Sequence, residues 1–347
     1  MDIHELKQRL QSHFTDGLVT IIGSGLSCAE GLPGMRELTA FLKTEIPQRV
    51  NGTDQQNWEE ILNLLDEGLN IEEAMLRKPP TQSLEAHIVD ITAKFLIERE
   101  ATVVSEVITG QKTLRFTRLL AHMLKPEAGI PVITTNYDRL IEIATERALL
   151  GVDTMFVGHH LGVLNERESR MSFCRAARLK ARRHVRLEYA ERVLLLKPHG
   201  SLDWFLLNDD PVRCPLSLSE SRLIITPGLN KFRTGYDRPF DAHREKANEC
   251  IDRATRFLIV GYGFNDDHLQ THLAPKLREG APALVLVKRL SENARGLIGE
   301  CDGMFALTER DDTGLQGTRY VDRHSEEHFA GPALWDLGVF VREVFEA

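Results

Sequence analysis

A buried strand that ends in a glycine turn constrains this 347-residue chain more than any other feature. The apolar run Leu18–Ile22 is followed by Gly-Ser-Gly-Leu-Ser at residues 23–27, and a helix start comes next. Glycines let a backbone approach an anion closely, and N–H groups at a helix N-terminus complement negative charge. The spacing differs from the Gly-x-Gly-x-x-Gly of dehydrogenases, so the turn alone is a weak sign of a nucleotide site. An ordinary strand-to-helix connection remains the commoner explanation.

Apolar runs separated by helical stretches predict an α/β fold with a doubly wound parallel sheet, Rossmann-like, that carries a helical insertion module. The expected strands are 18–22, 130–134, 193–197, 223–226, 257–260 and 283–287. The expected helices are 3–13, 138–150 and 332–346, and the spacing is helical almost throughout 36–125. We expect residues 1–35 and 126–300 to form the Rossmann-like domain, 36–125 an inserted helical module, and 301–347 a C-terminal extension with a terminal helix.

Composition and charge exclude several classes of function. A net charge of −8 argues against nucleic acid as a direct partner. No apolar run approaches the ~20 residues that span a bilayer, and the polar start predicts no signal peptide, so we expect a cytoplasmic protein. None of the five cysteines lies within four residues of another, which excludes a Cys-x-x-Cys zinc site. We interpret them as structural.

Residues 165–192 hold nine Lys or Arg against four Glu, a local excess of positive charge in an acidic protein. A solvated helix or hairpin is the favoured interpretation. The alternative is a docking surface for a phosphate-rich ligand or an acidic partner protein.

Open α/β sheets bind ligands at the carboxyl ends of their strands, so polar residues that follow a strand are the candidates for a site. Asn136 and Asp138 either cap the next helix, which is commoner, or orient a ribose or a water. His199 is either a turn residue or a general base that titrates near neutrality. Asn265 and Asp266 either cap a helix or contact a hydroxyl.

Together these four segments resemble the sirtuin family, in its bacterial sirtuin-like branch, over about residues 15–290. The family motif Gly-Ala-Gly-x-Ser-x-x-x-Gly-Ile-Pro-Asp-Phe-Arg is matched at Gly23, Gly25, Ser27, Gly31, Pro33 and Arg36. Its Thr-Gln-Asn-Ile-Asp, His-Gly and Gly-Thr-Ser segments are similar to residues 134–138, 199–200 and 261–263.

Three departures separate the chain from family deacylases. It lacks the four-cysteine zinc ribbon, so no zinc is expected, and Gly34-Met35 replaces the Asp-Phe of the motif. The long separation between Asn136 and His199 leaves His159 or His160 as rival bases. The pattern resembles the NAD-hydrolysing sirtuin-like effectors of bacterial antiphage defence, in which NAD is the substrate.

The resemblance implies an NAD+ hydrolase that cleaves the nicotinamide–ribose bond. The implied catalytic residues are Asn136, His199 and Asp138. The implied NAD-binding residues are Gly23, Ser24, Gly25, Ser27, Arg36, Gly200, Gly261, Gly263 and Asn265. Family members are gated by oligomerisation or by a partner such as a HerA-type ATPase, so a homo-oligomer or such a partner is expected. The alternatives are an NAD-dependent deacylase or ADP-ribosyltransferase, and a sensor that binds NAD without turnover.

Overall fold

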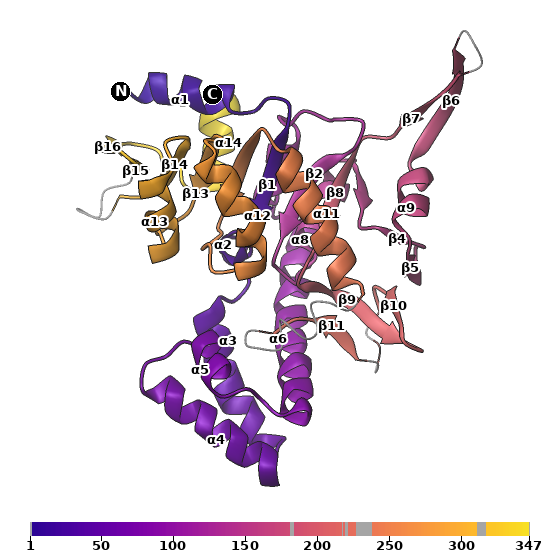
Figure 1. Ribbon diagram of the computed structural model, residues 1–347, viewed down its shortest axis with the longest axis vertical. Helices are drawn as coiled ribbons and strands as arrows, with labels where there is room; N and C mark the ends of the chain where they lie inside the picture. The colour runs from indigo at the N-terminus through magenta and orange to yellow at the C-terminus, as the bar shows by residue number, and fades with distance from the viewer. Residues whose placement is uncertain are drawn as a thin grey trace.

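A nine-stranded sheet forms the centre of the molecule (Figure 1). The structure is a computed structural model, and it describes residues 2–180, 184–216, 218, 221–226, 238–310 and 317–346. In spatial order its strands are β16 (Glu326–Ala330), β15 (Gly317–Asp322), β14 (Met304–Glu309), β13 (Ala283–Leu286), β12 (Arg256–Val260), β1 (Leu18–Ile22), β2 (Ile130–Thr134), β8 (Arg192–Leu196) and β3 (Gly151–Asp153). All neighbours from β14 to β3 run parallel, whereas β15 and β16 are antiparallel.

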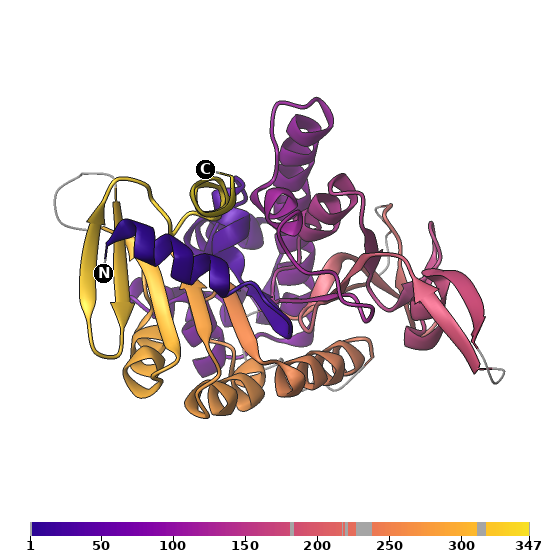
Figure 2. The same ribbon diagram turned by 90° about the horizontal axis from the view of Figure 1, so that it is seen from above.

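Helices cover both faces of this sheet, as expected of a doubly wound fold (Figure 2). The helices that pack on one face are α1 (Ile3–Ser12), α7 (Arg115–Leu120), α8 (Leu140–Arg147) and α14 (Leu337–Phe345). The other face is covered by α11 (Phe240–Arg253), α12 (Asp267–Arg278) and α13 (Glu292–Glu300). Successive residues of β12 alternate between the two cores, since Leu258 and Val260 face one and Phe257 and Ile259 the other. The predicted fold class is confirmed.

The stretch after the first strand is helical, as its apolar spacing predicts, while its division into an inserted module at 36–125 stays a prediction. It comprises α2 (Ser24–Ala29), α3 (Met35–Glu45), the 3₁₀ turn η1 (Ile46–Gln48), α4 (Gly52–Asp66), α5 (Ile71–Arg77) and α6 (Gln82–Ile108). Helices α3 to α5 and the first half of α6 enclose a hydrophobic core of their own, around Trp58 and Ile61. The second half of α6 enters the core of the main sheet through Val103 and Val107. One long helix thereby joins the module to the sheet (Figure 1).

A second, antiparallel sheet holds the strands β11 (Arg222–Ile224), β9 (Gly200–Leu207), β10 (Asp210–Arg213), β5 (Gly162–Leu164) and β4 (Phe156–Val157). The predicted strand 223–226 belongs here and not to the parallel sheet. It pairs antiparallel with β9. A parallel neighbour of β8 would need a long crossover connection, but β9 begins only a short turn after β8 ends, so β9 leaves the parallel sheet and β11 pairs with it in the second one.

Three further expectations need correction. Strand 283–287 is the last of the expected strands, but the parallel sheet continues beyond it, because β14, in the expected C-terminal extension, pairs parallel with β13. Helix α14 begins at Leu337 and not at 332, because Asp336 caps it by accepting the N–H groups of Gly338 and Val339. Helix α8 likewise begins at Leu140 and ends at Arg147, inside the predicted 138–150.

The basic stretch forms α9 (Glu166–Ser172) and a projecting hairpin of β6 (Cys174–Lys180) and β7 (His184–Tyr189), as the favoured interpretation predicted (Figure 1). Residues 181–183 lie outside the described part. Within that part, no helix has the length and apolar character needed to cross a membrane.

Candidate functional site

Most of the predicted site residues line one cavity of about 410 Å³ at the carboxyl ends of β1, β2, β8 and β12. They are Gly23, Ser24, Ser27, Asn136, Asp138, His199, Gly261, Gly263 and Asn265. A different cavity, of about 300 Å³, lies at the amino-terminal ends of β1 and β2 and holds none of them. The segments at 23–27, 134–138, 199 and 261–265 therefore meet where an open α/β sheet binds its ligands.

Five residues considered from the sequence lie elsewhere. Gly25 faces a neighbouring cavity. Arg36 is exposed on α3, and the rival bases His159 and His160 are exposed between β4 and β5. Gly200 is outside the lining because it packs beneath the site, where its φ of +87° and the carbonyl oxygen of Leu223, 2.0 Å from where a Cβ would stand, both require glycine.

The glycine loop is held by backbone contacts with the turn after β12. The Gly23 N–H donates to the Val260 carbonyl at 3.0 Å, and the Gly25 N–H donates to the Gly261 carbonyl at 2.9 Å. A Cβ on Gly23 would lie 2.5 Å from the Gly261 oxygen, and one on Gly25 2.7 Å from the Gly261 Cα. Close packing of two turns accounts for these glycines, and their approach to an anion stays a prediction.

Asn136, Ser27 and Asp138 form a buried hydrogen-bond chain. The Asn136 Nδ2 donates to the Gly23 carbonyl at 3.0 Å and to the Ser27 Oγ at 2.8 Å. Ser27 in turn donates its hydroxyl proton to the Asp138 Oδ2 at 2.6 Å. With both amide protons donated, Asn136 has its Oδ1 left to accept a hydrogen bond in the cavity. Asp138 thus fixes Asn136 through Ser27 and not by direct contact.

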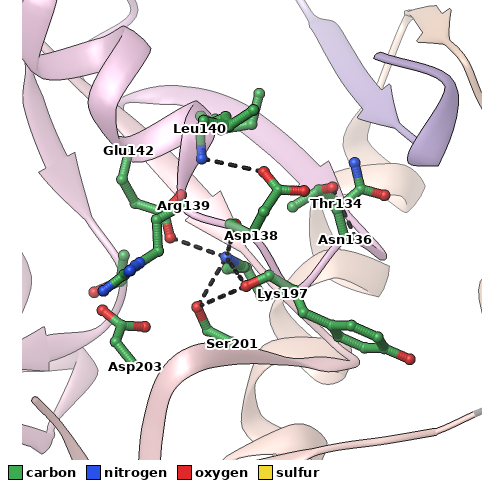
Figure 3. A network of polar contacts seen from close by, with 12 residues as sticks. Thr134, Asn136, Asp138, Arg139, Leu140, Glu142, Lys197, Ser201 and Asp203 are labelled. Carbon is green, nitrogen blue, oxygen red and sulfur yellow. Dashed lines mark hydrogen bonds and ion pairs between the residues drawn. The ribbon is translucent and has the colours of Figure 1, made fainter. Parts of the chain in front are cut away.

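Lys197 holds the turn that carries Asn136 and Asp138 from below (Figure 3). Its side chain is fully buried, and its Nζ donates to the carbonyls of Tyr137 and Asp138 at 3.3 and 2.6 Å. It also bonds the Glu142 Oε1 at 3.0 Å and the Ser201 Oγ at 2.9 Å. Burial raises the pKa of Glu142, and the charge of Lys197 opposes that rise. A buried cation therefore neutralises Glu142 and clamps the backbone of the site.

A second ion pair, between the buried Asp203 and the partly exposed Arg213, extends this polar network. Asp203 accepts from the Arg213 Nε at 2.8 Å. Burial alone would raise the pKa of Asp203, but Arg213 and Lys197 outweigh it and hold the pKa below its usual value. On the other side of the turn, the carboxylate of Glu100, on α6, accepts from the backbone N–H and guanidinium of Arg139. The module helix α6 is thus bonded directly to the site turn.

His199 is paired with Asp266, which is the contact that sequence reasoning missed. Its Nε2 lies against the Asp266 Oδ2, and the two residues are only 8% and 6% exposed. Asp266 is also the N-cap of α12, since its Oδ1 accepts from the Leu269 N–H at 2.9 Å. The capping role considered from the sequence is confirmed, and the histidine contact is added to it. No local pattern could have joined two residues so far apart in the chain.

The helical module supplies one wall of the cavity, which the sequence did not indicate. Leu38 of α3 and Asn70 and Glu72 at the start of α5 line it. No lysine or arginine is among the described residues that do so. The ionisable groups of the lining include the carboxylates Glu72, Asp138 and Asp266, so the cavity favours a cationic group over an anionic one. In the described part of the chain, no cluster of His, Cys, Asp or Glu is arranged to hold a metal ion.

A known family resembles the part of the chain that carries three of the four site segments. Residues 131–295 match the family model of the SIR2-like domain. This central segment is therefore similar to the SIR2-like domain. The match covers Asn136, His199 and Asp266 and begins after the glycine loop. No curated protein matches the chain.

Solved sirtuin structures align with nearly the whole chain at low identity. One, described as "The Structural basis of Sirtuin Substrate Affinity", is 14% identical, with 100% of this chain and 99% of that chain covered and a TM-score of 0.42. Another, "Sir2-p53 peptide-NAD+", is 14% identical, with 100% and 98% covered and a TM-score of 0.43. A third, "Structural Basis for the Mechanism and Regulation of Sir2 Enzymes", is 13% identical, with 99% of both chains covered and a TM-score of 0.43.

Proposed function

We propose that the cavity binds NAD+ and that the protein hydrolyses its nicotinamide–ribose bond. The observation that carries the proposal is the meeting of Asn136, Asp138 and His199, all from the segment similar to the SIR2-like domain, in one cavity. The cavity volume of about 410 Å³ falls within the roughly 300–1,000 Å³ typical of small-molecule sites. Following the resemblance to sirtuin-like defence effectors, we further propose that the activity depletes NAD during phage infection.

The charge of the cavity suits the reacting end of NAD+. Cleavage passes through an oxocarbenium-like state, in which positive charge develops on the ribose. The carboxylates of Glu72, Asp138 and Asp266 favour that charge electrostatically. His199 is the general base that takes a proton from the ribose hydroxyl or the attacking water, which supplies about 10²–10⁴ in rate. Asn136 accepts from the same water or hydroxyl through its Oδ1.

The pyrophosphate requires neutral donors, because the described lining has no lysine or arginine. Ser27 already donates its proton to Asp138, so we assign this contact to Ser24 and the nearby backbone. A neighbouring cavity, also about 410 Å³, shares Gly261 with the first and is lined by Lys288 and Trp335. A dinucleotide is elongated, and we assign its adenine end to this second cavity.

The test is incubation with NAD+, with nicotinamide and ADP-ribose quantified by chromatography and mass spectrometry. Hydrolysis yields the two in equal amounts. Modified acceptor or an acylated ADP-ribose would indicate a transferase or a deacylase. Intact NAD+ under saturating binding would indicate a sensor. Parallel reactions contain a HerA-type ATPase or another co-purified partner, because activity gated by assembly appears only with it. His199→Ala should abolish nicotinamide release while the protein stays folded.

A further inference from the structure

One carboxylate links His199 to the start of a helix. Asp266 has two oxygens with two different partners: Oδ1 accepts the Leu269 N–H at 2.9 Å, and Oδ2 meets the His199 Nε2. Helix capping fixes the orientation of the carboxylate, because the bond to Leu269 belongs to the first turn of α12. The direction in which Oδ2 points is therefore set by the helix.

The histidine is held from its own side as well. Its carbonyl accepts the Ile225 N–H at 3.0 Å, which ties the residue to the antiparallel sheet. Gly200 follows with its positive φ and packs against Leu223. Backbone contacts therefore place both His199 and Asp266, and both side chains are largely buried. Because water competes little for a buried polar contact, we expect the pair to keep one geometry.

We propose that Asp266 is a positioning residue: it accepts the Nε2–H of His199 and so makes Nδ1 the nitrogen that takes the proton during NAD+ cleavage. A carboxylate on one ring nitrogen fixes the tautomer and ring orientation and stabilises the imidazolium that forms. The proton moves from the substrate hydroxyl or water to Nδ1, and the ring becomes a cation between that proton and the Asp266 carboxylate. The kinetic part of this proposal rests on the proposed function.

The pair makes a prediction that is independent of turnover. In ¹⁵N-histidine-labelled protein, at a pH where the ring is neutral, His199 should carry its proton on Nε2. Its signals are identified by their loss in His199→Gln. Asp266→Ser keeps a side chain that can cap α12 but cannot reach the ring, and in this variant the two tautomers should mix. A proton on Nδ1 in the wild type, or a tautomer ratio unchanged by Asp266→Ser, would overturn the proposal.

Kinetics supply the second readout. Asp266→Ser should lower kcat for nicotinamide release about 10–100-fold, part of the about 10²–10⁴ that a general base supplies, with KM within about twofold. Asp267→Ser, at the exposed neighbouring position of α12, is the matched control and should behave as the wild type. Asp266→Asn, which also caps the helix, guards against misfolding of the serine variant. An unchanged kcat in both Asp266 variants would contradict the positioning role of Asp266 but not the hydrolase activity. If the wild-type protein leaves NAD+ intact, the proposed function fails. The tautomer measurement then still tests whether Asp266 accepts the Nε2–H of His199.

Discussion

Replacing Lys197 with methionine should lower the thermal stability of the protein. The substitution removes contacts that hold the turn carrying Asn136 and Asp138, and it replaces no side chain that lines the cavity. The Nζ is fully buried and bonds four oxygens, one of them from the buried carboxylate of Glu142. Methionine fills much of the same space and has no charge. Glu142 is then left as an uncompensated buried anion, and the carbonyls of Tyr137 and Asp138 lose their donor.

Removing one partner of a buried ion pair costs about 3–5 kcal/mol in the free energy of unfolding. An unfolding entropy of about 2.1 cal/mol/K per residue gives about 0.7 kcal/mol/K for 347 residues. The expected fall in Tm is therefore about 4–7 °C. The loss of stability caused by Lys197→Met should become smaller as the pH falls. Burial raises the pKa of Glu142 in the folded state, so acid that protonates it removes the unpaired charge and restores stability.

The assay is thermal unfolding of Lys197→Met at pH 8 and pH 5, followed by circular dichroism. The double variant Lys197→Met/Glu142→Leu is the matched control, since removing both charges together is often close to neutral. It should recover most of the Tm. An equal loss in the single and double variants, or a loss independent of pH, would refute the reasoning that the charge of Glu142 is what Lys197 compensates.

Three more predictions follow from the site. Asn136→Ala should reduce nicotinamide release below detection, measured by chromatography, with Tm within a few degrees of the wild type; normal turnover would remove Asn136 from the mechanism. Ser27→Ala should cost about 1.5–3 kcal/mol in chemical denaturation, because Asp138 loses a hydrogen bond to a buried charge, and a neutral result would show that water replaces the hydroxyl. Trp335→Ala should raise KM for NAD+ at least several-fold with kcat unchanged in steady-state kinetics, and an unchanged KM would place adenine outside the second cavity.

The parallel sheet could be predicted from the sequence because its strands are buried on both faces. β1 and β2 have the expected bounds. β8 is shifted by one residue toward the N-terminus, and β12 and β13 differ from the expectation by one residue at one end. Such runs stand out without any knowledge of neighbours. The run at 304–309 begins with four apolar residues and ends in Thr308 and Glu309. Its place in the sheet depends on pairing with β13, which a local sequence pattern does not reveal. The end of the sheet was therefore missed.

The sequence predicted the site residues that come directly after a strand. Asn136, Asp138 and His199 come to the cavity because the strands before them end at one edge of the sheet. Asp266 was considered only as a cap or a hydroxyl contact, because its pairing with His199 is a tertiary contact. Glu72 was missed for the same reason, since the position of the helical module over the sheet brings it there. The roles of all these residues in catalysis remain predictions.

A crystal structure of His199→Gln grown with NAD+ tests the central claim most directly. We predict that the nicotinamide ribose lies in the cavity lined by Asn136 and Asp266, with its hydroxyls within hydrogen-bond distance of the Asn136 Oδ1. Density for the dinucleotide at the other end of the sheet, or with the ribose turned away from residues 136 and 199, would contradict the account.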